Sequence, residues 1–217
     1  MKAHWEKVYQ KNREDQLGWY EELPEPSLNL IAECDLEKDS DILVVGAGAS
    51  MLIDELLASG YSGLVANDIS NSALEKLRQR LGKERSRQVQ WIVDDIIHPT
   101  LLESLGKVDL WHDRAVLHFF CDRQQQDAYF ELLRELVKGD GYVIIASFSL
   151  DGADRCSGLP VHRYDADMLK SRLGDDFELL TSDHLSHQMP DGQERRYIYT
   201  LWRRSPMNEG EIGGTNG

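Results

Sequence analysis

The stretch Asp41-Ile42-Leu43-Val44-Val45-Gly46-Ala47-Gly48-Ala49-Ser50 decides the fold of this chain. It is a continuous apolar run that ends at two closely spaced glycines. This pattern is typical of a strand that is buried on both faces and leads into a tight turn. Leucines recur at helical spacing over residues 51–58, so a helix is expected directly after the turn. The stretch therefore predicts the first half of a βαβ unit.

A second apolar segment begins at Leu64 and ends at Asp68. Asp68 lies about twenty residues past the glycines, which is the separation typical of a carboxylate that binds ribose hydroxyls at the tip of a second strand. Gly46 and Gly48 would let the backbone pass close to a ligand where a Cβ would collide. The following helix would offer free N–H groups at its start. These residues predict a nucleotide-like ligand, with Asp68 accepting hydrogen bonds from two ribose hydroxyls.

Strands and helices alternate through the next hundred residues. Further strands are expected at 63–67, 88–93, 108–111 and 142–148, and helices at 71–81 and 123–137. A loop rich in Gly, Asp and Pro is expected at 151–161, followed by a short helix at 165–173. Strand-like runs at 177–187 and 195–203 come next, joined by a turn at 189–192. The predicted fold class is α/β, with a doubly wound, mostly parallel sheet completed by an antiparallel hairpin.

The ends of the chain read differently from its middle. Helices are expected over residues 4–11 and from Pro26, so residues 1–35 are interpreted as an N-terminal helical cap on a single domain of residues 1–204. The spaced aromatic residues Trp5, Tyr9, Trp19 and Tyr20 would either pack this cap onto the domain or, in part, close over a ligand. Residues 205–217 contain four glycines and no core-forming run, which predicts a disordered tail.

Composition excludes several classes of function. The formal charge of −14 argues against a general nucleic-acid or anionic-membrane binder, because phosphate contacts need clustered Lys and Arg. Cys34, Cys121 and Cys156 are scattered, which indicates neither a metal site nor a disulfide framework. No apolar run is long enough to span a bilayer, so a cytoplasmic protein is expected. The sequence carries no signal for oligomeric state.

Taken jointly, the strand ends resemble those of class I S-adenosylmethionine (SAM) dependent methyltransferases over residues 4–204. The resemblance rests on six features: the glycine turn, Asp68, the pair Asp95-Ile96, Asp113 in the fourth strand, the turn Gly139-Asp140-Gly141 before the fifth strand, and the terminal hairpin. It implies a seven-stranded sheet of order 3-2-1-4-5-7-6 with strand seven antiparallel, SAM as cofactor and S-adenosylhomocysteine as product. A dinucleotide-binding fingerprint would need a third glycine where Met51 stands, which disfavours a dehydrogenase.

Two further segments narrow the resemblance. Trp5-Glu6-Lys7-Val8-Tyr9, read with Trp19-Tyr20, is similar to the lysine methyltransferases of elongation factor and citrate synthase. The segment from Trp111 to Phe119 and Cys156-Ser157-Gly158-Leu159-Pro160 look most like the citrate-synthase branch and its uncharacterised bacterial relatives. This branch implies a protein lysine as a possible methyl acceptor. A small-molecule methyltransferase acting on a thiol or a metalloid, and a non-catalytic SAM-binding module, remain alternatives.

The resemblance also implies site residues. The cofactor set is Trp19, Gly46, Ala47, Gly48, Asp68, Ile69, Asp94, Asp95, Ile96 and Asp113. In this set Asp95 is favoured over Asp94 as the carboxylate that binds the adenine amine. Many members also carry an acidic residue where this chain has Val44, and that acid helps to orient the SAM ammonium group.

Asp113 and His118 are the candidate catalytic residues. Asp113 would bind the SAM amine or a cationic acceptor, unless it pairs structurally with Arg114. His118 would be the base, because an imidazole titrates near neutrality, unless it is an ordinary core residue.

Overall fold

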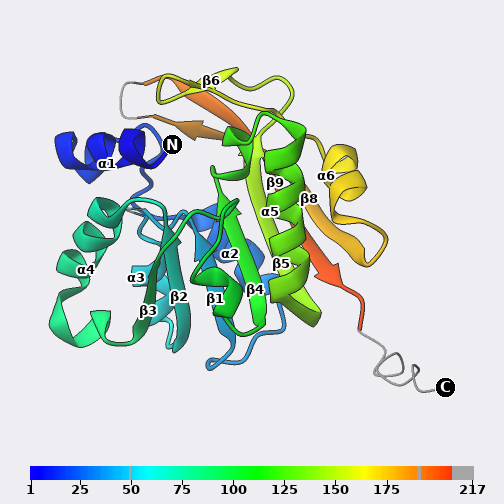
Figure 1. Cartoon of the computed structure of the whole chain (residues 1–217), viewed down its shortest axis with the longest axis horizontal. Coiled ribbons are helices and arrows are strands. Elements are labelled where there is room, and N and C mark those ends of the chain that lie inside the picture. Colours follow the sequence, from blue (N-terminus) through cyan, green and yellow to red (C-terminus); the bar gives the residue numbers. More distant parts are fainter. Residues whose placement is uncertain (49, 190–191, 207–217) are drawn as a thin grey trace.

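The computed structural model describes residues 1–48, 50–189 and 192–206. Its centre is a seven-stranded sheet of order β3-β2-β1-β4-β5-β9-β8 (Figure 1). The strands of this sheet are β1 (Asp41–Val45), β2 (Gly63–Asp68), β3 (Val89–Val93), β4 (Val108–Arg114), β5 (Val137–Phe148), β8 (Phe177–Gln188) and β9 (Glu194–Arg204). Strand β9 is antiparallel to both of its neighbours, while the β3-β2-β1-β4-β5 pairs are parallel. The predicted sheet order is thus confirmed, with β8 and β9 as its sixth and seventh strands.

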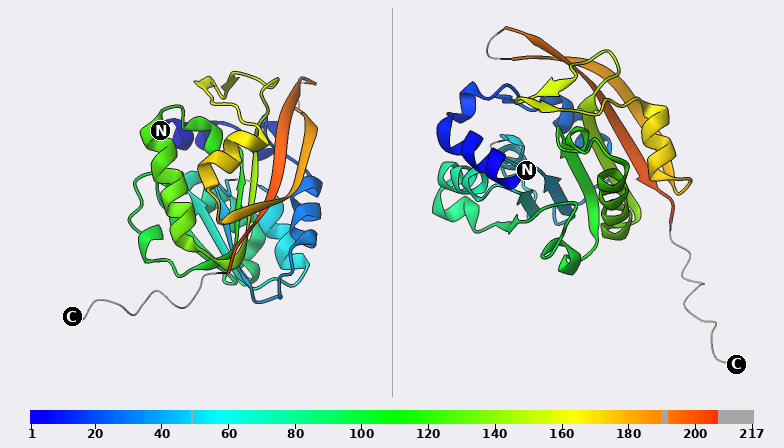
Figure 2. Two further views of the ribbon diagram at one scale, coloured as in Figure 1. Left: turned by 90° about the vertical axis from the view of Figure 1, so that its right-hand side faces the viewer. Right: turned by 45° about the horizontal axis from the view of Figure 1, so that its top comes forward.

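Helices cover both faces of the sheet (Figure 2). The α-helices are α1 (Lys2–Lys11), α2 (Glu25–Glu33), α3 (Leu52–Ala58), α4 (Asn71–Ser86), α5 (Arg123–Leu136) and α6 (Ala166–Leu173). Single 3-10 turns are η1 (Glu14–Gln16), η2 (Leu102–Ser104) and η3 (Leu117–Phe119). Apolar side chains of α2, α3 and α4 pack on one face of the sheet, and those of α5 and α6 pack on the other.

The alternation of side chains along β1 explains these two cores. Ile42 and Val44 point into the core under α2 and α3, whereas Leu43 and Val45 point into the core under α5. All four are at most 2% exposed, as expected for a central parallel strand buried on both faces. The same alternation along β4 places Asp113 and Arg114 on opposite faces of the sheet, because successive side chains of a strand point in opposite directions.

Three details differ from the sequence-based expectations. Strand β5 begins at Val137, so the segment Gly139-Asp140-Gly141 belongs to the strand instead of preceding it as a turn. Residues 155–160 form a small hairpin of β6 (Arg155–Cys156) and β7 (Leu159–Pro160), where only a loop was expected. Residues 190–191 of the predicted hairpin turn, and 207–217 of the predicted tail, lie outside the described residues.

The N-terminal segment lies across the carboxyl ends of the strands. Helix α1 lies next to α4 (Figure 1), where the carboxylate of Glu6 accepts hydrogen bonds from the N–H groups of Asn71 and Ser72 at 2.6 and 3.3 Å. Lys76 of α4 donates a hydrogen bond of 2.7 Å to the carbonyl of Asn12. These contacts fix α1 beside the strand ends at which a ligand site is predicted.

Candidate functional site

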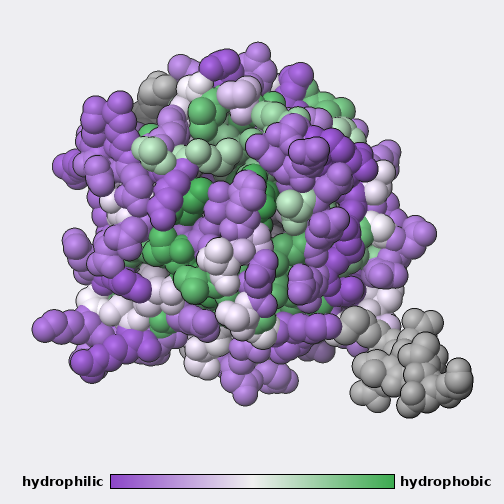
Figure 3. All heavy atoms as spheres, viewed as in Figure 1, coloured by the Kyte–Doolittle hydropathy of each residue, from purple (hydrophilic) through white to green (hydrophobic). Residues whose placement is uncertain are grey.

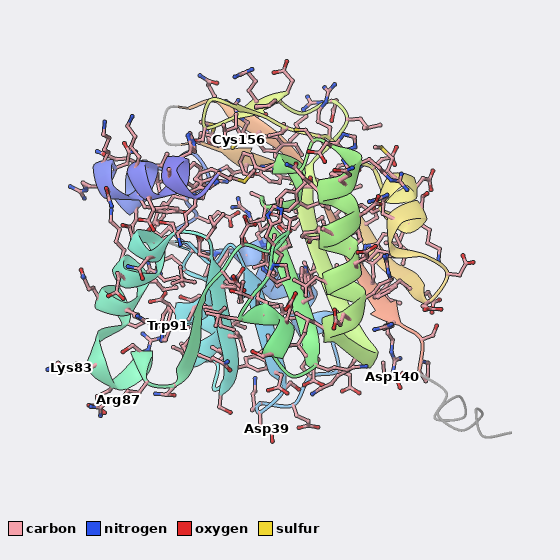
Figure 4. The ribbon with its side chains drawn as sticks, viewed as in Figure 1. Asp39, Lys83, Arg87, Trp91, Asp140 and Cys156 are labelled. Atoms are coloured by element: carbon pink, nitrogen blue, oxygen red, sulfur yellow. The ribbon has the colours of Figure 1, made fainter. Side chains whose placement is uncertain are left out.

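A pocket of about 700 Å³ lies at the carboxyl ends of β1, β2 and β4, and we call it the strand-end pocket. Its volume is in the range of small-molecule sites, roughly 300–1,000 Å³. The residues that line it are Met1, Trp5, Tyr9, Trp19, Val45, Gly46, Asn67, Asp68, Ile69, Asp94, Asp95, Ile96, Arg114, Ala115, Val116, Phe119, Phe120 and Cys156. Figure 4 shows Cys156 at this edge, while Asp39 before β1 and Asp140 in β5 lie at the opposite edge.

The surface around this edge is uneven in polarity. The face seen in Figure 3 is covered largely by hydrophilic side chains, and apolar side chains gather in its middle, between α1 and α5. Within the pocket the walls are mainly apolar, with the few polar groups concentrated at the strand ends. This distribution is typical of small-molecule sites, in which a few polar groups fix the orientation of the ligand.

The glycine turn is required by the fold as well as by a ligand. Gly46 and Gly48 have φ of 60° and 49°, a region that strongly favours glycine. A Cβ at Gly48 would lie 2.4 Å from the hydroxyl oxygen of Tyr9, and one at Gly46 would lie 2.1 Å from a methyl carbon of Val116. The sequence predicts that a Cβ at these glycines would collide with a ligand. In the structure the first atoms that such a Cβ would meet belong to Tyr9 and Val116.

Asp68 is oriented by the turn that it faces. One carboxylate oxygen accepts a hydrogen bond of 2.9 Å from the N–H of Gly48, and the other accepts one of 2.8 Å from the N–H of Ser70. The side chain is nearly buried, and burial, partly offset by these hydrogen bonds, raises the pKa of Asp68 to about 7. Each oxygen retains a lone pair, so the carboxylate can still accept hydrogen bonds from a ligand.

The adjacent carboxylates Asp94 and Asp95 have different surroundings. Asp94 accepts hydrogen bonds from the N–H groups of Thr100, Leu101 and Leu102 at 2.8–3.0 Å, and so fastens the loop after β3. Burial raises the pKa of Asp94, but these hydrogen bonds outweigh burial and lower the pKa overall. Asp95 accepts one backbone hydrogen bond, from Ile97, its other oxygen lies 3.5 Å from Nδ1 of the exposed His98, and its side chain is 33% exposed. Asp95 is thus less committed than Asp94 and has more capacity for a ligand.

Asp113, which was expected beside the acceptor, is not among the residues that line the strand-end pocket. Its side chain is fully buried beneath α5. It accepts hydrogen bonds from Val116 and Leu117 N–H groups at 2.9 and 3.0 Å and from the hydroxyl of Tyr129 at 2.7 Å. Asp113 therefore secures the turn after β4, and it does not pair with Arg114.

His118 is likewise not among the residues that line the strand-end pocket. The ring is fully buried, stacked on Phe148 at a centroid distance of 4.5 Å and edge-on to Phe119 at 4.4 Å. Neither ring nitrogen has a hydrogen-bond partner among the described residues. Burial, with Arg114 as a smaller cause, lowers the pKa of His118 to about 3. The alternative interpretation as a core histidine fits this geometry, and the role of a base does not.

Aromatic side chains from three segments form one wall of the pocket. The ring of Trp5 lies edge-on to Trp19 at 5.5 Å and to Phe119 at 5.0 Å, and the ring of Tyr9 lies 6.1 Å from Trp19. We call Trp5, Tyr9, Trp19 and Phe119 the aromatic wall. Trp19 was expected in the cofactor set, whereas Trp5, Tyr9 and Phe119 are additional lining residues. The spaced aromatics of the N-terminal segment gave a signal for Trp5 and Tyr9, and no pattern singled out Phe119.

A second pocket of about 470 Å³ continues past the glycine turn, and we call it the glycine-turn pocket. It is lined by Tyr9, Glu14, Leu17, Trp19, Tyr20, Glu21, Val44, Val45, Gly46, Ala47, Gly48, Ser50, His112 and Arg114. Arg114 lines both pockets, and its guanidinium lies 2.9 Å from the carboxylate of Glu21. From the sequence, Arg114 was expected only as a structural partner of Asp113 and not as a pocket residue.

The comparisons with known proteins agree with this site. Residues 43–143 match a family model described as a methyltransferase domain. EEF1A lysine methyltransferase 2 of Danio rerio is 27% identical over 117 residues, which are 52% of this chain and 49% of that protein. The chain thus spans about half the length of this curated relative.

Solved structures resemble the whole fold at low identity. A SAM-dependent methyltransferase from Anabaena variabilis superposes with a TM-score of 0.73 at 14% identity, over 94% of this chain and 93% of that one. The N-methyltransferase NodS of Bradyrhizobium japonicum, solved in complex with S-adenosyl-L-homocysteine, superposes with a TM-score of 0.65 at 14% identity, over 93% and 98%. These likenesses concern the fold.

The match to a methyltransferase domain model over residues 43–143, the sheet order and the strand-end residues are those of the class I methyltransferases, a class of enzymes whose cofactor is S-adenosylmethionine. The residues present fit that cofactor, because Gly46 and Gly48 line the pockets beside the carboxylate of Asp68, whose oxygens can still accept hydrogen bonds from ribose hydroxyls. No helix in the described part of the chain is long and apolar enough to cross a membrane.

Proposed function

We propose that this enzyme methylates an amine, and that the acceptor is a protein lysine side chain. The observation that carries the proposal is the aromatic wall, which lies in the same pocket as Asp68 and Asp95. Aromatic faces attract alkylammonium groups through cation–π interactions, and this attraction persists when the nitrogen carries methyl groups. The acidic chain, at −14, would also attract a basic protein surface over a longer range. The name of the curated relative, a lysine methyltransferase, points to the same acceptor.

The cofactor roles follow from the position of each side chain. Gly46, Ala47 and Gly48 would leave room for the cofactor at the turn, and Asp68 would accept hydrogen bonds from its ribose. Asp95 would bind the adenine amine, with Ile69 and Ile96 packing on apolar parts of the ligand. When bound, the cofactor supplies a methyl group whose carbon is electrophilic because it is attached to a positively charged sulfonium, and the neutral thioether S-adenosylhomocysteine is the leaving group.

The enzyme's own contribution is alignment. Asp113 and His118 do not line the strand-end pocket, so neither is placed to accept a proton from an acceptor there. An amine nucleophile still has to expose its lone pair, and we infer that it loses its proton to water before transfer. Trp5, Trp19 and Phe119 would then hold the amine against the methyl group and exclude solvent, since positioning supplies much of the rate of such a displacement.

The test is transfer of tritiated methyl groups from SAM into a cell lysate that is afterwards separated into protein and small-molecule fractions. We expect label in protein, recovered after acid hydrolysis as methylated lysine. Asp68→Ala should remove the label, because it weakens cofactor binding on the order of tenfold to a hundredfold. Glu178→Ala is the matched control, since it removes the same charge from the exposed face of β8. Label confined to the small-molecule fraction would reject the lysine acceptor.

A small-molecule acceptor is the second candidate, and it has an observation of its own. The strand-end pocket is lined in part by Trp5 and Tyr9 of α1 and by Cys156 of β6, and its volume of about 700 Å³ suits a small ligand. The 1,6-didemethyltoxoflavin-N1-methyltransferase of Burkholderia thailandensis also superposes over 91% of this chain, with a TM-score of 0.64 at 18% identity. The metalloid version has less support, because the described cysteines form no cluster and burial raises the pKa of Cys156 to about 11.

A further inference from the structure

The glycine-turn pocket contains a largely buried ion pair. Nη2 of Arg114 lies 2.9 Å from Oε1 of Glu21, and the two side chains are 11% and 14% exposed. The remaining nitrogens of Arg114 donate to the hydroxyl of Tyr199 at 2.8 Å and to the carbonyl of Trp19 at 2.9 Å. The guanidinium is therefore held rigidly beside the turn, with its charge balanced by one carboxylate.

The other ionisable groups of this pocket are already committed or neutral. Glu14 pairs with Arg80 at 2.6 Å. His112 is buried, and burial, with Arg114 as a smaller cause, lowers its pKa to about 3, so that it is neutral at physiological pH. His187, at 3.9 Å from Glu21, also has a lowered pKa because of burial and then of Arg114. Glu21 and Arg114 thus provide the one negative and the one positive group that a ligand in this pocket would meet among the described lining residues.

The same region lacks the acidic residue of the glycine strand. Val44 occupies that position, is 2% exposed and lines the pocket with Glu21. Val44 pairs with His112 on the neighbouring strand β4, and Nε2 of His112 lies 2.9 Å from the hydroxyl of Ser27. Nδ1 of His112 is buried without a hydrogen-bond partner in the described structure.

We propose that Glu21 and Arg114 bind the amino-acid end of the cofactor, with Glu21 facing its ammonium group and Arg114 its carboxylate. A zwitterion that leaves water needs one partner of each sign, and this ion pair offers both at a fixed separation. Glu21 then takes the role of the acidic residue that many class I methyltransferases carry at the position of Val44. It lies in the N-terminal segment instead of in β1. The adenosine end would occupy the adjoining strand-end pocket, with which the glycine-turn pocket shares Tyr9, Trp19, Val45, Gly46 and Arg114.

This inference rests on the cofactor assignment, so the test separates the two. Calorimetry would compare S-adenosylhomocysteine with 5′-methylthioadenosine, which has the adenosine and sulfur but no amino-acid end. The wild-type protein should bind S-adenosylhomocysteine at least tenfold more tightly. Glu21→Gln, which keeps the side-chain shape, should weaken S-adenosylhomocysteine by about tenfold to a hundredfold and change methylthioadenosine by less than about threefold. Glu22→Gln, at the exposed neighbour of Glu21 that lines neither pocket, is the control that should change neither affinity by more than about threefold.

A measurement on the unmodified protein keeps the proposal testable if a variant does not fold. An S-adenosylhomocysteine analogue without the α-carboxylate should bind the wild-type protein at least tenfold more weakly than the parent compound. Equal affinities for the parent, this analogue and methylthioadenosine would overturn the proposal, as would an equal loss of both ligands in Glu21→Gln. Failure of every adenosine ligand to bind the wild-type protein would reject the cofactor assignment itself.

Discussion

The hydroxyl of Tyr129 on α5 donates a hydrogen bond of 2.7 Å to the carboxylate of Asp113 at the end of β4. The same hydroxyl accepts a hydrogen bond of 3.1 Å from the indole nitrogen of Trp111. With the N–H groups of Val116 and Leu117 as further donors, the carboxylate joins the strand, the following turn and the covering helix. That turn carries Val116, which lines the strand-end pocket, so Asp113 shapes the site from behind.

Tyr129→Phe should therefore lower stability with little effect on cofactor binding. The change removes the strongest neutral donor from a buried carboxylate and leaves the indole N–H of Trp111 without an acceptor, which costs about 1–3 kcal/mol. The measurement is urea unfolding together with calorimetric titration of S-adenosylhomocysteine. A variant of unchanged stability that binds the ligand much more weakly would place Tyr129 and Asp113 with the ligand instead.

Asp113 should also make the unfolding free energy depend on pH. Burial, partly offset by its hydrogen bonds, raises the pKa of Asp113 from 3.8 to about 6. The folded protein therefore holds this proton to a higher pH than the unfolded chain does. Its contribution to the unfolding free energy falls as the pH rises from about 4 to about 6, and is constant above that.

Unfolding by urea at several pH values between 5 and 8, for the wild-type protein and for Asp113→Asn, measures this contribution. The wild-type protein should lose stability relative to the variant as the pH rises from 5 to about 6, and the difference should then level off. Asp113→Asn is also expected to be less stable at pH 8, because its amide presents N–H groups to the backbone donors. A wild-type advantage that grows over pH 5–6 would mean that folding lowers the pKa of Asp113.

The two carboxylates after β3 should separate binding from stability. Asp94→Ala removes the acceptor of several loop hydrogen bonds, so we expect a loss of about 2 kcal/mol or more in the free energy of unfolding. Asp95→Ala should change stability by less than about 1 kcal/mol and weaken S-adenosylhomocysteine by roughly tenfold. Thermal unfolding and calorimetry on both variants check this, and the reverse pattern would assign the adenine contact to Asp94.

The sheet was more predictable than the site for a physical reason. The buried run 41–45 and the Asp68 tip are local patterns that act through strand burial and turn geometry, and the strand order followed from the family resemblance. The direction of a side chain at a strand end depends on register: one step along β4 separates Asp113, under α5, from Arg114, in the pockets. Glu21 reaches Arg114 only through tertiary packing of the N-terminal segment, for which the sequence pattern carries no signal.

His118 provides the sharpest test of how the acceptor loses its proton. Its ring nitrogens are buried without partners in the described structure, and with a pKa of about 3 it is neutral throughout the working pH range. His118→Leu removes two unsatisfied polar atoms and keeps an apolar side chain of similar volume, so stability should be equal or higher. The rate of methyl transfer should depend on pH in the same way in the variant and in the wild-type protein, because that dependence would follow the protonation of the acceptor amine. The measurement is the rate of tritium transfer from pH 6 to pH 9 for the wild-type protein and the variant. A rate that falls in His118→Leu at low pH and recovers at high pH would restore His118 as the base, and would require its ring to turn into the pocket during catalysis.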